Sequence, residues 1–285
     1  YFAAGRSSFL DGGILVYAID RLTGSVVHKS RASGRNLKTG EQPKGIIKGF
    51  DMPSGLPDVL SSDGSNVYMR DLMFDDQCTQ QPSAQRHLFS PTGFLDDSWW
   101  HRGYWLFGDS FSSGWGGWHR MGNQVPAGRL MVFDDTTIYG FGRNFIPSGN
   151  AGQWRKGEFY RLFAAAKEPK PLEKKPAQPN NKRRNRAPKS RVDYKWSNRI
   201  EPEVRAMVLA GDLLFVAGPH GETHKKQAAF EGDEGISLQA VSTSDGSILA
   251  QYQLDSLPVF DGMAAARGQL YLSTKDGRVL CFGAK

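Results

Sequence analysis

A hairpin-like pattern recurs along this chain, and it constrains the fold more than any other feature of the sequence. In each copy, two or three apolar residues precede a tight turn rich in Gly and Asp, and an apolar strand with an aromatic residue follows. The aromatic residues are Tyr68, Tyr139, Phe215 and Tyr271; with Phe2 as the first member, their separations are 66, 71, 76 and 56 residues. Repetition of one supersecondary unit is typical of a propeller or a solenoid.

The two ends of the chain carry this unit most clearly. Residues 236–254, ISLQAVSTSDGSILAQYQL, match residues 14–30, ILVYAIDRLTGSVVHKS, without a gap. In the first copy Asp20 opens the turn, and Gly24 supplies the backbone conformation that closes it. The chain also has 33 glycines and 15 prolines, so many turns are expected. These features predict an all-β fold with short strands.

Residues 16–28, VYAIDRLTGSVVH, resemble the repeat of pyrroloquinoline-quinone-like (PQQ-like) β-propellers. That repeat ends a strand with Tyr-Ala-Leu/Ile-Asp, turns at Thr-Gly, and usually has a Trp where this chain has His28. Residues 269–282, QLYLSTKDGRVLCF, are similar to the inner strands of a blade. The resemblance covers residues 1–30 and 205–283, and the whole chain, including GFLDDSWWHRGYW, looks like propeller-bearing proteins of planctomycete-type bacteria.

The resemblance implies a single β-propeller domain over residues 1–285. Two insertions are expected inside it: an aromatic-rich one at 91–123 and a basic, Pro-rich one at 164–196. About five repeat units are visible, whereas propellers have about four to eight blades. The ring is therefore either short, or incomplete and the C-terminal portion of a larger one. Because Tyr1 starts inside a strand-like run, we expect residues upstream of Tyr1 to complete it.

The catalytic residues of the PQQ dehydrogenases do not carry over to this chain. Those enzymes use two adjacent cysteines, a calcium ion held by Glu and Asn, and an Asp base. This chain has only Cys78 and Cys281, which are not adjacent, and no matching Glu, Asn and Asp set. PQQ-dependent dehydrogenation is therefore not expected, and no cofactor is predicted.

The stretch 91–123 holds five of the seven tryptophans, with glycines between them. Exposed Trp and Tyr faces stack on sugar rings, and small-ligand sites combine apolar walls with a few polar groups. Aromatic residues of this kind also pack between blades without any ligand. The candidate ligand-binding residues are Trp99, Trp100, Arg102, Tyr104, Trp105, Trp115, Trp118 and Arg120.

Three histidines, His87, His101 and His119, lie within 33 residues. With Asp97 or Asp109 they could bind zinc or copper. His101, His119 and the same two aspartates are also the weak candidates for acid–base catalysis on a polysaccharide. Each of these histidines has an Arg as its neighbour, which disfavours a cation, so hydrogen-bonded structural histidines are the leading interpretation. His220 and His224 lie in a polar loop, 218–235, and are expected to be solvated.

The positive charge of the chain comes from one segment. The formal net charge is +7, and the segment 167–191 alone contributes ten Lys or Arg and two Glu. With five prolines and almost no apolar residues, this segment is expected to be an exposed insertion between blades, or an extended arm. Its partner would be an acidic polysaccharide or a protein surface; nucleic acid is disfavoured, and a solubilising linker is the alternative.

No run of about 18 apolar residues is present, so no membrane span is predicted. Cys78 and Cys281 either form a long-range disulfide or remain two free thiols. The leading functional hypothesis is a non-catalytic binding scaffold, periplasmic or on the bacterial cell surface, that contacts a protein or a neutral or acidic polysaccharide. The alternatives are an enzyme domain acting on polysaccharide, with a metal ion as an open option, and a subunit of a larger redox or surface complex.

Overall fold

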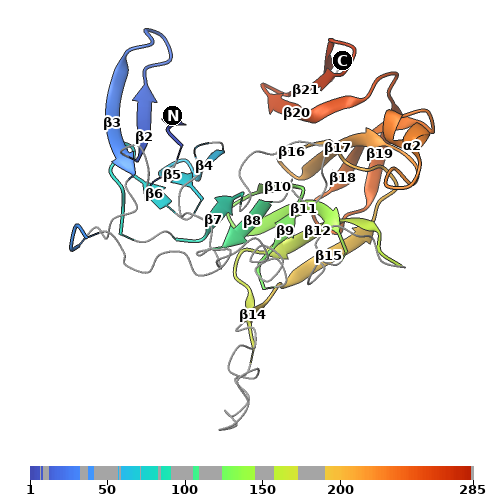
Figure 1. The fold of residues 1–285 in the computed structure, drawn as a ribbon. Helices are drawn as coiled ribbons and strands as arrows, with labels where there is room; N and C mark the ends of the chain where they lie inside the picture. Colours follow the sequence, from blue (N-terminus) through green and yellow to red (C-terminus); the bar gives the residue numbers. More distant parts are fainter. Residues whose placement is uncertain are drawn as a thin grey trace. The chain divides into compact units, whose positions relative to one another are not determined.

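The computed structural model describes residues 1–6, 8, 13–32, 38–41, 57, 59–70, 72–82, 85–90, 105–108, 124–144, 157–172 and 190–283. Nearly all regular structure in these ranges is β-strand, with one short helix, α2 (Gln227–Glu231), which confirms the all-β class (Figure 1). The chain divides into two compact units: the first holds the described residues up to Ala127, and the second holds those from Gly128 onward. The sequence alone predicts one domain, and the two units are described separately below.

The first unit contains three sheets, each made of strands that are consecutive along the chain; the last strand ends with Gly128, where the second unit begins. The first sheet has the order β1 (Phe2–Ala4), β2 (Ile14–Ile19), β3 (Val26–Ala32); the second has β4 (Leu60–Ser62), β5 (Val67–Met69), β6 (Leu72–Phe74); the third has β7 (His87–Phe89), β8 (Trp105–Gly108), β9 (Ala127–Gly128). The first two sheets share a core in which Ile14 and Val16 of β2 pack with Met69 and Phe74. Alternate residues of β2 are buried there, as expected for a strand with one face toward the core.

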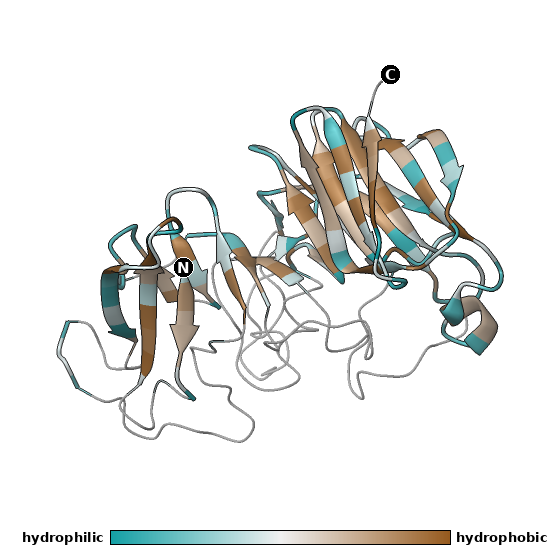
Figure 2. Cartoon of the chain, turned by 90° about the horizontal axis from the view of Figure 1, so that it is seen from above, coloured by the Kyte–Doolittle hydropathy of each residue, from teal (hydrophilic) through white to brown (hydrophobic). Residues whose placement is uncertain are grey.

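The second unit contains three larger sheets in the same style (Figure 2). The first has the order β10 (Leu130–Phe133), β11 (Thr137–Arg143), β12 (Tyr160–Ala166), β15 (Tyr194–Arg199); the second has β16 (Ala206–Ala210), β17 (Leu213–Pro219), β18 (Ile236–Ser242), β19 (Ile248–Gln253); the third has β20 (Pro258–Ala266), β21 (Gln269–Thr274), β22 (Val279–Gly283). Their first strands lie side by side, because β10 contacts β16 and β16 contacts β20. Apolar residues along the middle of the strands fill the two layers between the sheets.

The hairpins expected from the sequence are present, and Tyr68, Tyr139, Phe215 and Tyr271 all lie in the second strand of a sheet. Phe2 was the wrong first member of this series. It lies in β1, and its cross-strand partner in β2 is Tyr17, whose ring stacks on it at 4.7 Å. Tyr17 is therefore the aromatic residue at the repeated position of the first sheet.

The five visible repeats were also an undercount. The third sheet was missed because its middle strand, Trp105–Gly108, lies inside the aromatic stretch 91–123, where no strand period is evident. Three residues of this four-residue strand, Leu106, Phe107 and Gly108, are buried. So short a strand shows too few alternations to stand out from its aromatic, Gly-rich surroundings.

The basic insertion lies between two strands of one sheet. The expectation that it lies between two blades was therefore wrong. It leaves β12 and returns in β15, the third and fourth strands of the same sheet. At its base, β13 (Lys170–Pro171) pairs with β14 (Ser190–Arg191) in a two-stranded ribbon. Lys170 Nζ also forms an ion pair with Asp193 at 2.7 Å. Between these strands, residues 173–189 lie outside the described part of the chain.

One turn design recurs in two of the hairpins. In the second sheet, Asp63 Oδ1 accepts hydrogen bonds from the backbone N–H groups of Ser65 (2.9 Å) and Asn66 (2.7 Å), and Oδ2 accepts one from Tyr68 Oη at 2.6 Å. The aspartate side chain caps the turn, and the hydroxyl of the tyrosine five residues later donates a hydrogen bond to that aspartate. Asp134 and Tyr139 repeat this arrangement at 3.1 Å.

This pairing shifts the proton affinity of both side chains in the second sheet. Burial raises the pKa of the Tyr68 hydroxyl, and the hydrogen bond to Asp63 and the charge of that carboxylate raise it further, to about 12. Partial burial acts to raise the pKa of Asp63, but the hydrogen bonds from Tyr68, Asn66 and Ser65 together hold it below its ordinary value. The hairpin is therefore most stable with Tyr68 protonated and Asp63 ionised.

Replacing Tyr68 by phenylalanine is expected to lower the free energy of unfolding by about 0.5–1.5 kcal/mol at neutral pH, the usual worth of one hydrogen bond. The folded-state pKa of Tyr68 lies above the unfolded value of about 10, so its contribution is fully present below pH 10 and is lost as the pH rises toward 12. Denaturation of both proteins across this pH range measures the difference. A difference that stays constant up to pH 12 would contradict the assignment.

Candidate functional site

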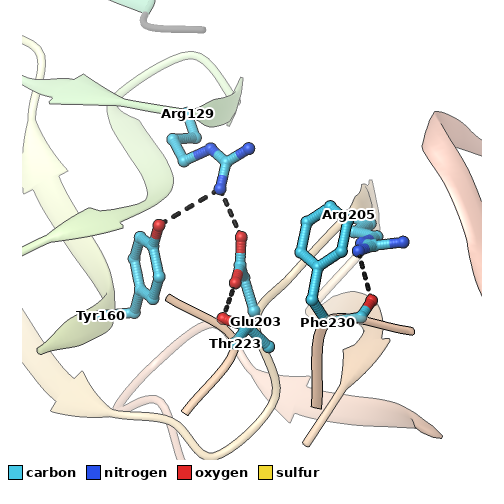
Figure 3. A network of polar contacts seen from close by, with 6 residues as sticks. All are labelled: Arg129, Tyr160, Glu203, Arg205, Thr223 and Phe230. Carbon is cyan, nitrogen blue, oxygen red and sulfur yellow. Dashed lines mark hydrogen bonds and ion pairs between the residues drawn. The ribbon is translucent and has the colours of Figure 1, made fainter. Parts of the chain in front are cut away.

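A polar cluster is buried inside the second unit, around Arg129 and Glu203 (Figure 3). Arg129 directly precedes β10, and Tyr160 begins β12. Glu203 lies in the segment between β15 and β16, and Thr223 lies in the loop after β17. Four parts of the chain that are distant in sequence therefore meet at this point.

The contacts in the cluster are short and involve both oxygens of the glutamate. Arg129 Nη1 donates hydrogen bonds to Glu203 Oε1 at 2.5 Å and to Tyr160 Oη at 3.2 Å, and Thr223 Oγ1 donates to Glu203 Oε2. The side chains of Arg129 and Glu203 are only 2% and 7% exposed. Buried charges are tolerated when they are paired and hydrogen-bonded. Glu203 thus connects Arg129, next to β10, with the loop after β17, and Arg129 contacts Tyr160 of β12.

The backbone around Glu203 runs alongside β17. The N–H of Glu203 donates to the carbonyl oxygen of Pro219 at 2.8 Å, and the N–H of Arg205 donates to that of Ala217 at 2.8 Å. Gly218 lies between these two acceptors. A β-carbon at Gly218 would overlap the carbonyl oxygen of Glu203, so this close approach requires glycine.

Arg205 occupies the position in its sheet that Arg129 occupies in the preceding one. The N–H of Arg129 donates a hydrogen bond to the carbonyl oxygen of Phe141 in β11. In the same way, the N–H of Arg205 donates to the carbonyl oxygen of Ala217 in β17. Arg205 Nη2 also donates to Phe230 O at 2.7 Å, and its guanidinium lies 4.4 Å from the Phe230 ring centroid, which fastens α2 to the sheet (Figure 3). The common Arg at the start of RLMVF and RAMVL was the sequence signal for these buried arginines.

A cleft of about 330 Å³ opens beside this cluster. Tyr160 and Glu203 form part of its wall, together with Phe159, Arg199 and His224. The guanidinium of Arg199 lies 5.5 Å from the Phe159 ring centroid. Volumes of this size fall in the range of small-ligand sites.

The charges around the cleft are mixed. At its edge Lys225 Nζ pairs with Glu222 at 2.6 Å. Burial lowers the pKa of His224, and the neighbouring Lys225 lowers it further, against the opposite influence of Glu222 and Glu203. The net direction favours the neutral form of the His224 imidazole. Such a cleft can hydrogen-bond a polar ligand, and both oxygens of its buried glutamate already accept hydrogen bonds, from Arg129 and from Thr223.

Most of the site residues expected from the sequence lie outside the described part of the chain. They are Asp97, Trp99, Trp100, His101, Arg102, Tyr104, Asp109, Trp115, Trp118, His119 and Arg120. Trp105 is described: it begins β8 and is half-buried. Within the described ranges, no group of three or more His, Cys, Asp or Glu side chains is placed to hold a metal ion.

His87, a weak candidate for a metal ligand whose leading interpretation was a structural histidine, is packed inside the first unit. Its side chain is 2% exposed, and its ring stacks on Tyr68 with the centroids 3.9 Å apart. Nδ1 lies 2.6 Å from the carbonyl oxygen of Gln85, and Nε2 contacts the carbonyl oxygen of Arg70. Both ring nitrogens therefore face backbone oxygens, which is the setting of a structural histidine.

Two further expectations concern cysteines and the polar loop. Cys78 and Cys281 are free thiols, the first buried and the second exposed. In the loop 218–235, His220 is not simply solvated, because its Nε2 lies 2.7 Å from Ser237 Oγ, and His224 lines the cleft. In the described segments, no helix has both the length and the apolar character needed to cross a membrane.

The described structure defines the class of this protein as an all-β protein built from antiparallel sheets in chain order. No family model and no curated protein matches the sequence. Among solved structures, the chain is similar to BamB from Moraxella catarrhalis, with 11% sequence identity and a TM-score of 0.39, over 95% of this chain and 67% of that one. A likeness at this level does not assign the chain to a family.

Proposed function

We propose that this chain is a β-propeller, or part of one, that works outside the cytoplasm as a scaffold and binds a protein or a polysaccharide. The order of the sheets carries the proposal. Each sheet is built from consecutive strands, except where the β13–β14 ribbon interrupts one of them. Neighbouring sheets of one unit meet through their first strands in three cases: β4 with β7, β10 with β16, and β16 with β20. Propeller blades follow one another in this way.

The buried polar groups of the second unit favour binding over catalysis. The Arg129–Glu203 contact and the Arg205–Phe230 contact join secondary structure elements. Groups committed to such contacts make the fold rigid. In repeat proteins, specific binding resides in segments that depart from the repeat. Here the residues that flank β8 in the stretch 91–123 depart from it most.

Binding to an immobilised panel of neutral and acidic polysaccharides tests this proposal. Wild-type protein is expected to bind at least one of them, and the double variant Trp99→Ala, Trp100→Ala is expected to bind about tenfold or more weakly, since stacking on two rings is lost. Leu22→Ala, which removes a large apolar side chain 79% exposed in a turn, is the matched control and should bind normally.

Two results would contradict the scaffold proposal. The first is equal binding by the tryptophan variant and the wild type, which would exclude the aromatic stretch as the contact surface. The second is cleavage of a bound polysaccharide by the wild type that is abolished in His101→Ala, which would show an enzyme.

A further inference from the structure

The cleft of about 330 Å³ in the second unit has walls that the fold holds in place. Its described lining residues come from three segments: 157–160 at the start of β12, 199–203 from the end of β15, and 221–225 in the loop after β17. The first segment is fixed next to β11, because Phe159 and Asn144 exchange two hydrogen bonds, of 2.9 and 3.2 Å. The third is packed closely at Gly221, where a β-carbon would overlap a carboxylate oxygen of Glu234.

Most charges in these walls are balanced by ion pairs within the protein. The pairs are Arg129–Glu203, Arg143–Glu158 and Lys225–Glu222. Two further charged residues line the cleft, Arg199 and Glu201, and they have opposite signs. When the buried arginines are included, the described walls therefore carry as many positive as negative charges. A ligand without net charge preserves this balance, whereas an ion disturbs it.

Glu158 has one carboxylate oxygen that lacks a hydrogen-bond donor. Its side chain is only 5% exposed, and Oε2 forms the ion pair with Arg143. The other oxygen, Oε1, is buried and accepts no hydrogen bond from any residue that the structure describes. Glu203 differs, because both of its oxygens have donors. A buried acceptor without a donor is costly, and since Glu158 lines the cleft, a ligand bound there is placed to supply the donor.

Arg199 and Glu201 provide a donor and an acceptor that solvent can reach. Both residues are exposed, and among the described residues neither side chain has an ion-pair partner. The guanidinium of Arg199 lies 5.5 Å from the ring centroid of Phe159, a cation–π contact that orients it. Its N–H groups remain available, because this contact uses the face of the guanidinium and not its edge.

A ligand that fits these groups must both donate and accept hydrogen bonds. Glu158 and Glu201 require donors, whereas Arg199 requires an acceptor. A hydroxyl group does both, so a neutral molecule with several hydroxyl groups satisfies all three residues without adding charge. The cleft volume lies at the lower end of the range for small-ligand sites, which suits a single sugar ring, and Phe159 gives the cleft an apolar surface.

We propose that this cleft binds one neutral sugar residue, whose hydroxyl groups donate to Glu158 and Glu201 and accept from Arg199. A free monosaccharide and the terminal residue of a polysaccharide share this chemistry. None of the described residues that line the cleft belongs to the aromatic stretch 91–123. The site is therefore additional to the one proposed above, and the two are tested by different variants.

The test measures binding of glucose, galactose, mannose and N-acetylglucosamine to the whole chain by saturation-transfer NMR, with methylammonium and acetate as charged probes. We expect at least one sugar to bind and neither ion to do so. Arg199→Met keeps the packing on Phe159 but removes the donors, and should weaken sugar binding about tenfold or more. Arg278→Met, which removes an exposed arginine of the same unit, is the matched control and should bind normally.

Glu158→Gln should also weaken sugar binding. Because this substitution alters a buried ion pair, urea denaturation must first show that the variant is folded. Arg199→Met breaks no buried pair, so its result decides the question even if Glu158→Gln does not fold. Binding of an ion in place of every sugar would overturn the proposal, as would equal sugar binding by Arg199→Met and the wild type.

The double variant Trp99→Ala, Trp100→Ala separates the two sites. We expect it to bind the monosaccharide as the wild type does, whereas loss of that binding would assign the sugar to the aromatic stretch and overturn the inference. In this variant, a linear oligosaccharide of the same sugar distinguishes the two sources of the ligand. Binding of the oligosaccharide that Arg199→Met weakens would show that the cleft takes a chain end, and binding of the monosaccharide alone would show that it takes a free sugar.

Discussion

Replacing Glu203 by alanine is expected to lower the free energy of unfolding by about 3–5 kcal/mol, the usual cost of breaking a buried ion pair from one side. The substitution removes the carboxylate that Arg129 contacts at 2.5 Å while the arginine stays in the interior. It also removes the acceptor for Thr223, so the loop after β17 loses its tie to β10. Urea denaturation of the whole chain measures the change.

A double-mutant cycle separates the ion pair from general packing. Arg129→Met removes the charge but keeps much of the side-chain volume, and we expect the double variant Glu203→Ala, Arg129→Met to be more stable than the sum of the single effects predicts. Glu222→Ala is the matched control, because its pair with Lys225 is exposed and should have no measurable effect. A cost for Glu203→Ala as small as that of Glu222→Ala would show that the buried pair does not stabilise the unit.

The second large effect is expected at Phe163, in the third strand of the first sheet of the second unit. Its side chain is fully buried and meets the ring of Tyr194 edge-on, with the centroids 5.3 Å apart. Across the strands it is paired with Gly140, and its ring covers the glycine. Phe163→Ala is expected to cost about 3–5 kcal/mol, because the transfer energy is lost and a cavity remains.

Gly140 provides the companion variant. A β-carbon at this position would overlap the ring of Phe163, so Gly140→Ala is expected to cost about 1–3 kcal/mol through overpacking. In the double variant the new methyl group enters the space that the ring has left, and the combined loss should be smaller than the sum. Gly283→Ala, where the nearest atom would be 3.5 Å away, is a control that should be tolerated. Strict additivity of the two losses would contradict the stacking of the ring on the glycine.

The prediction of hairpins from the sequence succeeded where the interactions are local. The turn opened by Asp63 is completed by Tyr68, five residues later, and the same spacing joins Asp134 to Tyr139. The match of residues 236–254 to 14–30 also holds, since Gly24 and Gly246 adopt φ values of 73° and 74° after equivalent turns. Such features need only a few neighbouring residues, so their pattern survives in the linear sequence.

The prediction failed where strands are short or insertions are long. The strand Trp105–Gly108 has four residues, too few for its alternation to be seen among so many aromatics. The basic insertion was expected between blades, but the pairing of β12 with β15 shows that it lies within a sheet. Composition identifies an insertion, whereas only strand pairing shows which strands it separates.

By itself, the sequence determined the all-β class, the position of most hairpins and the residues of their turns, because these depend on contacts within a few residues. Only the tertiary structure decided the rest. Arg129 meets Glu203 across 74 residues, and Trp196 meets Thr243 across 47. Contacts at such separations form when the sheets pack together and remove polar groups from water. Each buried charge is then paired with a group that this packing brings next to it. No local pattern encodes those partners.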